Sequence, residues 1–379
     1  MKKVVMACAN YWTTPFQVGS HHIARAFAHR GWEVAFISDP ISVPHFLRFS
    51  GSLKDRFDLY RKGGVKEKNI WAYVPGGLLT PYNYPLLKSP WLHKNWQNLT
   101  FPSVVSKLRK KGFGEPDLLY LDSPLQAFWN KTLSPRFSIY RVADYNKGFL
   151  QTSPAKARLE EELIADVDCA IYTADSLKAY VESLQPKRME FVPNGVDLGH
   201  FREKQPRPEE YQYLTGPIAL YVGALHEWFD YDLINAAAVA LPHINFVIIG
   251  PSEAQKFNLR SNIHLLGARS WNKIPAYMQH ASVGLIPFDV EAFPELIHRV
   301  NPLKLYEYMA CGLPVVSRQW DELKRLDSPA LLAPSKEEFI ALIEKAVPSE
   351  SLQGFAEKHD WKKRVDQIIS IYHSLEKKG

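Results

Sequence analysis

Short apolar runs alternate with helix-like stretches along the first half of the chain. Residues 3–9 (KVVMACA) form a valine-rich run, and a helical pattern spans Ile23 to His29 after a loop that contains Pro15 and Gly19. A second apolar run, Glu33 to Ser38, follows at once. This order of strand, loop, helix and strand predicts the start of a Rossmann-like unit. Later segments continue the alternation: strand 117–122, helix 125–131, strand 137–142, helix 156–165, strand 169–173 and helix 175–184.

The same alternation starts again after residue 217. The segment from Phe191 to Asp197 contains Asn194-Gly195, a pair typical of turns, and a proline-rich charged run over 202–217 is expected to be a linker. The second series is strand 218–222, helix 230–241, strands 245–249 and 263–266, helix 274–280, strand 283–286, helix 302–311 and strand 314–317. Since a chain of 379 residues suits two domains, we predict an α/β protein with two doubly wound Rossmann-like domains.

The helix predicted over 302–311 has clear start and stop signals. Asn301 is a preferred N-cap, Pro302 suits the first helical position, and Gly312 is a typical residue just past a helix end. The residues expected to face the core recur at helical spacing: Leu303, Tyr306, Met309 and Ala310. The residues expected on the other side are Lys304, Glu307 and Tyr308. One side of this helix is therefore predicted to pack and the other to bind a ligand.

Lys304 lies in the first turn of this helix, against the positive end of the helix dipole. That position is unfavourable by about 0.3–1 kcal/mol unless an anion binds there and is shared with the free backbone N–H groups. We interpret it as a phosphate site, with Glu307 one turn further on accepting hydrogen bonds from ribose hydroxyls. The alternative is an intrahelical Lys–Glu pair on the surface. The apolar strand LPVVS that follows at once favours the nucleotide site.

The order of Lys304, Glu307, a small-residue helix end and Gly-x-Pro-Val-Val resembles the nucleotide-sugar motif of GT-B glycosyltransferases. Short pieces elsewhere are similar to the xanthan-type glucuronosyltransferases of bacterial polysaccharide biosynthesis, which are inverting enzymes. These pieces are Tyr140, Arg141 and Asp144; Gly195 to Asp197; Val222 and Gly223; and Lys304, Leu305, Tyr308 and Gly312 to Pro314. Two departures count against the common retaining type: His226 and Glu227 replace an Arg and Lys pair, and Arg299 replaces a second Glu.

The resemblance implies the GT-B fold, in which two Rossmann-like domains face each other across a cleft and the final helix crosses back to the first domain. The expected acceptor-binding domain is 1–198, completed by the helix 359–379, and the expected nucleotide-sugar domain is 199–358. The tail agrees with this expectation, because Val365, Ile368, Ile369, Tyr372 and Leu375 recur at helical spacing between Asp360 and Glu376.

In the donor site that the resemblance implies, Lys304 contacts the diphosphate and Glu307 contacts the ribose. Phe288, which follows Ile286-Pro287, is expected to lie against the uracil, and Gly223 and Leu303 complete the donor-binding set. A glucuronic acid donor also needs a cation for its carboxylate. Arg299 and His298 are the candidates, because they stand next to the start of the helix.

The strand over 137–142 ends in Ala143 and Asp144, at the edge of the sheet where ligands bind in doubly wound folds. The resemblance makes Asp144 the general base that deprotonates an acceptor hydroxyl. The alternative is that Asp144 caps the next turn. Trp12, Gly19 and His21 lie in the loop after the first strand and are predicted to contact the acceptor, whereas the alternative for His21 is a helix-capping or core role.

The formal net charge of +6 is concentrated in one segment. Between His45 and Lys111 there are thirteen cations and three acids, interleaved with many Phe, Tyr and Trp residues. This combination is typical of surfaces that bind an anionic membrane or single-stranded nucleic acid, and a solvated face with a few buried rings is the third possibility. No RNA-binding motif accompanies the segment. Because the rest of the chain resembles a transferase, we predict a membrane face that collects a lipid-linked acceptor, and no nucleic acid.

Other classes of site are not expected. Cys8, Cys169 and Cys311 are odd in number and lie in or beside apolar elements, so they are predicted to be reduced core thiols of a cytosolic protein. No metal-ligand spacing occurs, and the triplets Asp166-Val-Asp168 and Asp230-Tyr-Asp232 are expected to cap helices or strands. We therefore expect no metal and no cofactor beyond a UDP sugar as co-substrate. We also expect no signal peptide and no membrane-spanning helix, so the chain is expected to be soluble or peripheral. With the resemblance to transferases of lipid-linked acceptors, we predict a cytoplasmic protein peripheral to the inner face of the cell membrane.

The sequence therefore predicts an inverting GT-B glycosyltransferase of bacterial surface or exopolysaccharide synthesis. It is expected to transfer a sugar, with glucuronic acid as the first candidate, from a UDP donor to a lipid-linked oligosaccharide. The alternatives are a retaining GT-B hexosyltransferase, a sugar-nucleotide epimerase of the same fold and, outside enzymes, a nucleic-acid-binding protein.

Overall fold

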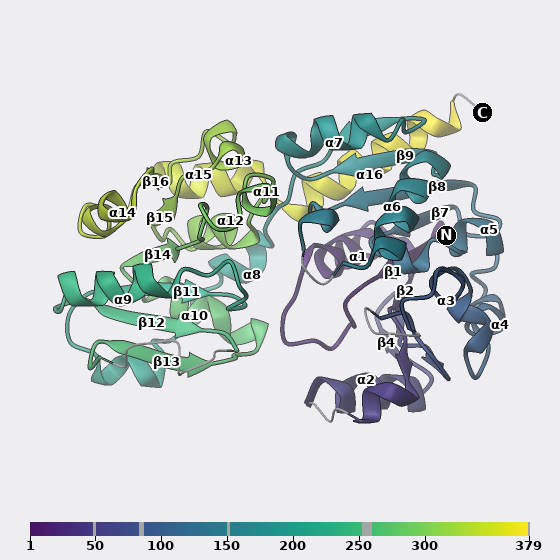
Figure 1. Cartoon of the computed structure of the whole chain (residues 1–379), viewed down its shortest axis with the longest axis horizontal. Helices are drawn as coiled ribbons and strands as arrows, with labels where there is room; N and C mark the ends of the chain where they lie inside the picture. The colour runs from purple at the N-terminus through teal and green to yellow at the C-terminus, as the bar shows by residue number, and fades with distance from the viewer. Residues whose placement is uncertain (48–50, 83–86, 150–151, 252–259, 378–379) are drawn as a thin grey trace. The chain divides into compact units, whose positions relative to one another are not determined.

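The computed structural model describes residues 1–47, 51–82, 87–149, 152–251 and 260–377. The chain divides into two compact units (Figure 1). Unit 1 comprises Met1–Pro193 together with Arg364–Gly379, and unit 2 comprises Asn194–Lys363. Among the described residues, no helix combines the length and the apolar character that a bilayer crossing requires.

Unit 1 is built on an eight-stranded sheet in the order β10-β9-β8-β7-β1-β2-β5-β4. Its strands are β1 (Lys3–Cys8), β2 (Glu33–Ser38), β4 (Val65–Glu67), β5 (Ile70–Tyr73), β7 (Leu118–Leu121), β8 (Phe137–Val142), β9 (Cys169–Tyr172) and β10 (Met189–Phe191). All neighbours pair in parallel except β4, which is antiparallel to β5. The central strands are almost entirely buried, as expected of a parallel sheet with both faces covered.

Unit 1 also contains eight helices and five short 3-10 turns among its described residues. They are α1 (Gly19–His29), α2 (Gly51–Arg61), α3 (Pro90–Asn95), α4 (Val104–Lys110), α5 (Trp129–Thr132), α6 (Pro154–Asp166), α7 (Lys178–Ser183) and most of α16 (Trp361–Glu376), with the 3-10 turns η1 (Val43–Leu47), η2 (Trp96–Leu99), η3 (Pro124–Gln126), η4 (Asn146–Gly148) and η5 (Asp175–Leu177). A separate two-stranded piece pairs β3 (Ile41–Ser42) with β6 (Gly76–Gly77). The segment 45–111 is thus more regular than its sequence pattern suggested.

The C-terminal helix α16 belongs to unit 1 from Arg364 onward, which confirms the predicted return of the chain to its first domain. The Arg30 guanidinium donates two hydrogen bonds to the Asp366 carboxylate, at 2.6 and 2.5 Å. The Tyr372 ring lies edge-on to Trp32 and to Phe137, with centroid distances of 5.4 and 5.6 Å. An ion pair and an apolar contact therefore both hold the last helix against unit 1.

Unit 2 contains a six-stranded parallel sheet in the order β13-β12-β11-β14-β15-β16. Its strands are β11 (Ile218–Val222), β12 (Asn245–Ile249), β13 (Ile263–Gly267), β14 (Val283–Ile286), β15 (Val315–Arg318) and β16 (Leu331–Ala333). Its helices are α8 (Leu198–Arg202), α9 (Tyr231–Ala240), α10 (Ile274–Gln279), α11 (Pro294–Ile297), α12 (Leu303–Ala310), α13 (Asp321–Arg325), α14 (Lys336–Ile343) and α15 (Glu350–Lys358), with turns η6 (Glu209–Tyr213) and η8 (Trp271–Lys273). The two sheets confirm the predicted pair of doubly wound Rossmann-like domains.

In each sheet the strand order reverses beside the first strand of the unit. In unit 1 this reversal lies where β1 separates β2 from β7, and in unit 2 it lies where β11 separates β12 from β14. Doubly wound sheets bind ligands outside the carboxyl ends of the strands at such a reversal. The loops that follow β7 and β8, and those that follow β11 and β14, are therefore the places to examine for chemistry.

Two local predictions differ from the structure. The run 202–217 is not an open linker, because α8 and η6 fall within or beside it and Tyr211 is fully buried. Asn301 does not cap α12: the N-cap is Pro302, without a side-chain hydrogen bond. The Asn301 amide oxygen instead accepts a hydrogen bond from the Tyr306 hydroxyl at 2.7 Å, because both side chains are buried and need partners.

Candidate functional site

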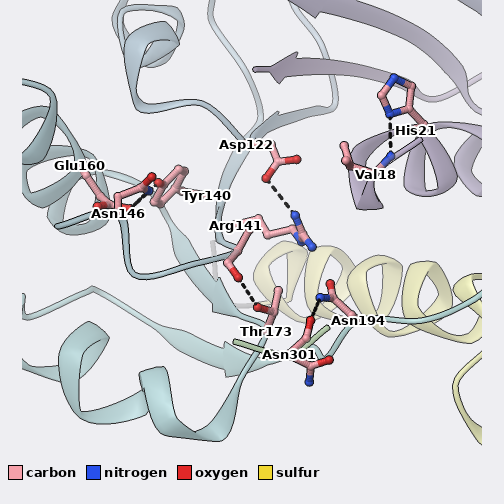
Figure 2. Close-up of polar contacts among 11 residues, drawn as sticks. Val18, His21, Asp122, Tyr140, Arg141, Asn146, Glu160, Thr173, Asn194 and Asn301 are labelled. Carbon is pink, nitrogen blue, oxygen red and sulfur yellow. Dashed lines mark hydrogen bonds and ion pairs between the residues drawn. The ribbon is translucent and has the colours of Figure 1, made fainter. Parts of the chain in front are cut away.

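Two carboxylates and an arginine gather at the carboxyl ends of β7 and β8 in unit 1. Asp122 directly follows β7, and Arg141 is the penultimate residue of β8. The Arg141 Nη1 lies 3.0 Å from Asp122 Oδ1, and the two side chains are only 7% and 8% exposed (Figure 2). Burial raises the pKa of Asp122, and the charge of Arg141 opposes that effect. Burying either charge alone would cost free energy, and the pairing of Arg141 with Asp122 offsets part of that cost at the edge of the sheet.

Asp144 lies two residues beyond the end of β8 and is partly buried. Burial raises the pKa of Asp144, the neighbouring Arg141 lowers it, and Asp122 raises it. The next turn, η4, has Tyr145 at its N-cap position and no side-chain capping hydrogen bond. Asp144 therefore does not cap that turn, in contrast to the alternative interpretation of the sequence. A carboxylate with a raised pKa accepts a proton more readily than an ordinary aspartate, which suits a general base.

The loop after β1 holds the three residues predicted to contact an acceptor, and the structure buries all of them. His21 has no exposed surface. Its Nδ1 accepts a hydrogen bond from the Val18 N–H at 3.2 Å (Figure 2), and its Nε2 lies 3.0 Å from the Tyr11 carbonyl oxygen. Burial lowers the pKa of His21 to about 4, so the ring is neutral and donates from Nε2. Both ring nitrogens of His21 therefore bond to the backbone of the loop, at Val18 and Tyr11.

Trp12 and Gly19 are also internal. Trp12 is 4% exposed, its Nε1 donates to Glu67 at 3.0 Å, and its ring lies edge-on to Phe36 at 5.1 Å. Gly19 is the buried first residue of α1, a helix that begins four residues before the predicted start. In this structure Trp12, Gly19 and His21 are all buried and support the loop from inside, and their contact with an acceptor stays a prediction.

In unit 2, Gly223 and Lys304 are in direct contact at the reversal of the strand order. Gly223 follows β11 with φ of +152°, and a Cβ placed on it would lie 3.1 Å from Lys304 Nζ and 3.1 Å from the Tyr221 hydroxyl. The positive φ favours glycine, and any larger residue would also crowd the end of the Lys304 side chain. The Lys304 ammonium lies over the rings of Phe288 and Tyr221, 4.6 and 4.8 Å from their centroids. The Lys304 ammonium therefore packs against the faces of two aromatic rings and against Gly223.

Lys304 and Glu307 lie one turn apart on α12, in a site that is poorly hydrated. Burial lowers the pKa of Lys304 to about 8 and raises the pKa of Glu307 to about 7, and each charge partly offsets the shift of the other. Within the described part of the chain, the Lys304 ammonium forms no hydrogen bond and no ion pair at contact distance. The intrahelical surface pair considered from the sequence is thus absent, and the ammonium is poised for an anion from outside the chain.

The remaining residues predicted for the donor site have different surroundings. Phe288 is 4% exposed and stacks on Trp320 at 5.6 Å, so it forms the floor under Lys304. Arg299 pairs with Glu295 at 2.7 Å, and His298 Nδ1 lies 3.0 Å from Asp321. Leu303 is partly buried at the start of α12.

Tyr308 was predicted on the ligand side of α12 and is instead part of the core. Its ring has no exposed surface, and its hydroxyl accepts a hydrogen bond from the Val222 N–H at 2.9 Å and donates to the Leu220 carbonyl oxygen at 3.3 Å. A Cβ on Gly284 would lie 2.6 Å from the same ring. The tyrosine therefore connects α12 to the backbone of β11, just before Gly223.

Both Asp-x-Asp triplets have structural partners. Asp168 accepts hydrogen bonds from the Ser138 N–H and hydroxyl at 2.8 and 2.9 Å, and Asp166 accepts one from Asn130 at 2.9 Å. Asp230 caps α9 through the Leu233 N–H at 2.8 Å and pairs with Lys336 at 2.7 Å. Across the ranges that the structure describes, no group of three or more His, Cys, Asp or Glu side chains is arranged to hold a metal ion.

The basic segment 45–111 divides its aromatic residues between core and surface. Trp71, Tyr73 and Trp96 are buried. A second set of large apolar side chains in and beside this segment is exposed by 36–78%: Val43, Phe46, Phe57, Leu78, Leu79, Tyr82, Trp91 and Phe101. We call this set the exposed apolar set. Single exposed apolar side chains are ordinary, but these eight fall within one stretch of the sequence, and a contiguous apolar patch commonly marks an interaction surface.

The sequence interpretation missed Asp122, Tyr221 and Trp320. Asp122 had a usable signal, because it directly follows the apolar run DLLYL in the same way that Asp144 follows β8. Tyr221 and Trp320 have no such signal: each is one aromatic residue in an apolar context, and only the folded chain shows Tyr221 beneath Lys304 and Trp320 against Phe288.

Comparisons with known proteins identify relatives of both halves of the chain. Residues 6–173 match the family model described as glucuronosyltransferase GumK, N-terminal domain, and residues 216–347 match the model described as glycosyl transferases group 1. A curated relative from Bacillus subtilis (strain 168), whose name describes a teichuronic acid biosynthesis glycosyltransferase, TuaH, is 23% identical over 210 residues. That match spans 50% of this chain and 52% of the relative, so the chain covers about half the length of the curated relative it matches.

Solved structures share the fold over the whole chain. Sucrose-phosphate synthase from Thermosynechococcus elongatus has a TM-score of 0.71 at 15% identity and covers 100% of both chains. Anabaena Alr3699/HepE in complex with UDP-glucose has a TM-score of 0.67 at 15% identity, and the match covers 99% of this chain and 100% of that one. At these identities the likeness shows the fold, which is GT-B.

Proposed function

Because this chain is a GT-B glycosyltransferase related to the GumK-type enzymes, we propose that it transfers glucuronic acid from UDP-glucuronic acid to a lipid-linked oligosaccharide in bacterial surface polysaccharide synthesis. The observation that carries the proposal is Lys304, a desolvated cation without an anionic contact at the start of α12. A helix N-terminus with a lysine beside a glycine is suited to a diphosphate, since backbone N–H groups and the ammonium share its charge.

The donor site proposed here uses three residues of unit 2. Lys304 holds the diphosphate, Gly223 lets it approach the backbone, and Glu307 accepts hydrogen bonds from the ribose hydroxyls. Arg299 is assigned to the sugar carboxylate. Its present partner Glu295 is 74% exposed, so the pair is a solvated one that a carboxylate ligand can replace at little cost.

In the reaction proposed here, Asp144 takes the proton of the attacking acceptor hydroxyl. The hydroxyl oxygen forms a bond to the anomeric carbon from the face opposite the diphosphate, and the bond between that carbon and the diphosphate oxygen breaks. UDP leaves with the electron pair, and Lys304 and the N–H groups of α12 stabilise its charge. One displacement on one face inverts the anomeric configuration. Burial raises the pKa of Asp144, with Arg141 lowering it and Asp122 raising it, and a raised pKa supports the role of base.

The donor is tested by thermal shift with UDP, UDP-glucose, UDP-glucuronic acid, GDP-mannose and ADP-glucose. We expect UDP compounds alone to stabilise the chain, with UDP-glucuronic acid giving the largest shift, because a ligand that binds only the folded state stabilises it by mass action. Arg299→Met is expected to reduce the shift with UDP-glucuronic acid and to leave the shift with UDP unchanged. Equal shifts with UDP-glucose and UDP-glucuronic acid would contradict the assignment of glucuronic acid.

The base and the stereochemistry are tested by transfer assays. Asp144→Asn is expected to lower kcat by about 100-fold or more while UDP still binds, because an amide cannot accept the proton. NMR of the product decides between inversion and retention, and a retained anomer would favour the retaining alternative, a mechanism also present in this fold class. We propose no metal and no cofactor, so EDTA is expected to leave the rate unchanged.

The acceptor is proposed to be reached at the inner face of the cell membrane, through the basic segment 45–111 and the exposed apolar set. Lysines and arginines attract anionic lipids and exposed rings enter the headgroup region. We expect the protein to sediment with phosphatidylglycerol vesicles at low salt and not with phosphatidylcholine vesicles. Double replacement of Trp91 and Phe101 by Ser should weaken this binding. Salt-sensitive binding of single-stranded RNA, instead of vesicles, would favour the nucleic-acid alternative.

A further inference from the structure

The loop that carries Asp144 contains little regular structure and relies on side chains from neighbouring elements. It runs from Ala143 to Gly148, with η4 as its one short turn. The Thr173 hydroxyl donates to the Ala143 carbonyl oxygen at 2.7 Å, Asn146 Nδ2 donates to Glu160 at 2.7 Å, and Lys147 pairs with Glu161 at 2.6 Å. Three contacts from outside the loop therefore set its path.

Glu160 is the unusual partner among these. It lies on α6 with no exposed surface, between the buried residues Leu159 and Leu163, where an apolar side chain would be the ordinary choice. Its carboxylate oxygens accept hydrogen bonds from three elements. Asn146 in the loop and Tyr140 on β8 donate at 2.7 Å each (Figure 2), and the Tyr180 hydroxyl on α7 donates at 3.2 Å. Burial raises the pKa of Glu160, which shows that placing a carboxyl here is costly.

The two short hydrogen bonds end on the same oxygen atom, Oε1. Tyr140 stands four residues before Asp144 and Asn146 stands two residues after it. One carboxylate oxygen thus bridges the two ends of the segment from Tyr140 to Asn146, which contains Asp144. A segment held at both ends limits how far Asp144 can move relative to β8, which is what a reacting carboxylate requires.

We propose that Glu160 is a positioning residue for Asp144, which it holds in place through its hydrogen bonds to Tyr140 and Asn146. The inference rests on the proposed function, in which Asp144 is the general base. Glu160 does not touch the reacting atoms and acts only through the loop.

Four variants separate this role from a general role in stability. Glu160→Leu removes the hydrogen bonds to Tyr140 and Asn146. Asn146→Ala removes only the hydrogen bond from the loop and leaves the core unaltered. Glu160→Gln is the conservative variant, because its Oε1 can still accept from Tyr140 and Asn146 while its Nε2 donates to the Tyr180 oxygen. Tyr180→Phe is the matched control, because it removes the hydrogen bond to the other oxygen, Oε2, and keeps the ring.

The assay is UDP release from UDP-glucuronic acid in the presence of a lipid-linked oligosaccharide. Glu160→Leu is expected to lower kcat by roughly 10- to 100-fold with the KM for donor unchanged, since a small misplacement of a reacting group has effects of this size. Asn146→Ala should lower kcat in the same way by about 3- to 10-fold. Glu160→Gln and Tyr180→Phe should stay within about threefold of the wild type.

The pH profile gives a readout that lost stability does not move. A base acts when deprotonated, so kcat rises with pH through the pKa of Asp144, which burial raises and which Arg141 and Asp122 modulate from β8 and the end of β7. A released loop admits water to Asp144, so its pKa falls, and the acidic limb of the profile in Asn146→Ala should move to lower pH by about half a unit to one unit. An unchanged limb would overturn the proposal.

The two levels of inference fail in different ways. If Asp144→Asn keeps its activity, the assignment of the base is wrong, and the proposed mechanism falls together with the positioning role. If Asp144→Asn is inactive but Asn146→Ala and Glu160→Leu keep the wild-type kcat, only the positioning role is overturned. If Glu160→Leu does not fold, Asn146→Ala decides, because the Asn146 side chain is partly exposed and lies outside the core.

Discussion

Replacing Lys304 by methionine should stabilise the empty protein and abolish nucleotide binding at the same time. The lysine bears its charge in a desolvated site, where burial lowers its pKa from 10.5 to about 8. The charged form of Lys304 is favoured less in the folded chain than in the unfolded chain. The charge therefore lowers the free energy of unfolding at neutral pH. Methionine keeps the apolar contact with Phe288 and Tyr221 but has no charge to desolvate.

The size of the effect follows from the pKa. A difference of about 2.5 units corresponds to roughly 3 kcal/mol. This is an upper limit, because the variant also leaves Glu307 without its neighbouring cation, so we expect a gain of about 1–2 kcal/mol at pH 7. For a unit of this size, each kcal/mol of added stability raises Tm by about 2–4 °C. Loss of a charge-assisted contact to the diphosphate should weaken UDP binding by about 1.5–3 kcal/mol, roughly 10- to 150-fold in Kd.

Calorimetry with and without UDP measures both effects in one experiment. The exposed Lys324→Met in the same unit is the matched control and should change stability by less than about 0.5 kcal/mol. The advantage of Lys304→Met over the wild type should also vanish as pH rises from about 8 to 10.5, since the wild-type lysine then loses its charge in both states. A Lys304→Met variant that is less stable than the wild type, or that keeps the full response to UDP, would refute the reasoning.

Three further outcomes are expected. The pKa of Glu307 is raised from 4.5 to about 7, so wild-type stability should fall between these pH values and rise again from about 8 to 10.5 through Lys304. Urea unfolding of the wild type against the double variant Lys304→Met, Glu307→Gln would show this minimum, and a constant difference would contradict it. Gly223→Ala should weaken UDP binding by about tenfold or more, because its Cβ would lie 3.1 Å from the Lys304 ammonium, and titration calorimetry measures the loss. Tyr308→Phe should lower the free energy of unfolding by about 1–3 kcal/mol, because the buried Val222 N–H loses its acceptor, and urea unfolding with an unchanged midpoint would exclude this.

Much of the fold could be predicted because its signals are local. Each buried parallel strand is a short apolar run, so the alternation of strands and helices was visible for both units. The predicted return of the last helix also depended on a local pattern, the apolar stripe that ends with Tyr372. The positions of Asp144 and Lys304 also followed from local signals, because Asp144 follows the end of a strand and Lys304 lies at the start of a helix.

The contacts that the sequence did not predict depend on which distant residues meet. Trp12 donates to Glu67, 55 residues away, and His21 lies against Phe36. Tyr308 shares a helical face with Lys304 in the sequence pattern, yet its hydroxyl binds the backbone of β11, 86 residues earlier. No local pattern distinguishes a ring that faces solvent from one that fills a gap between strands.

The sequence by itself determined where the chemistry-bearing residues stand along the elements, because strand ends, helix starts and glycines are set by backbone and side-chain preferences of a few neighbouring residues. The tertiary structure alone decided what surrounds them. Asp122 meets Arg141 because β7 and β8 are adjacent in the sheet, Glu160 reaches Tyr140 and Asn146 from another helix, and Lys304 lies on Phe288 and Tyr221. Desolvation and Coulombic contact act through space, so the protonation and reactivity of these groups depend on partners that the order of residues does not reveal.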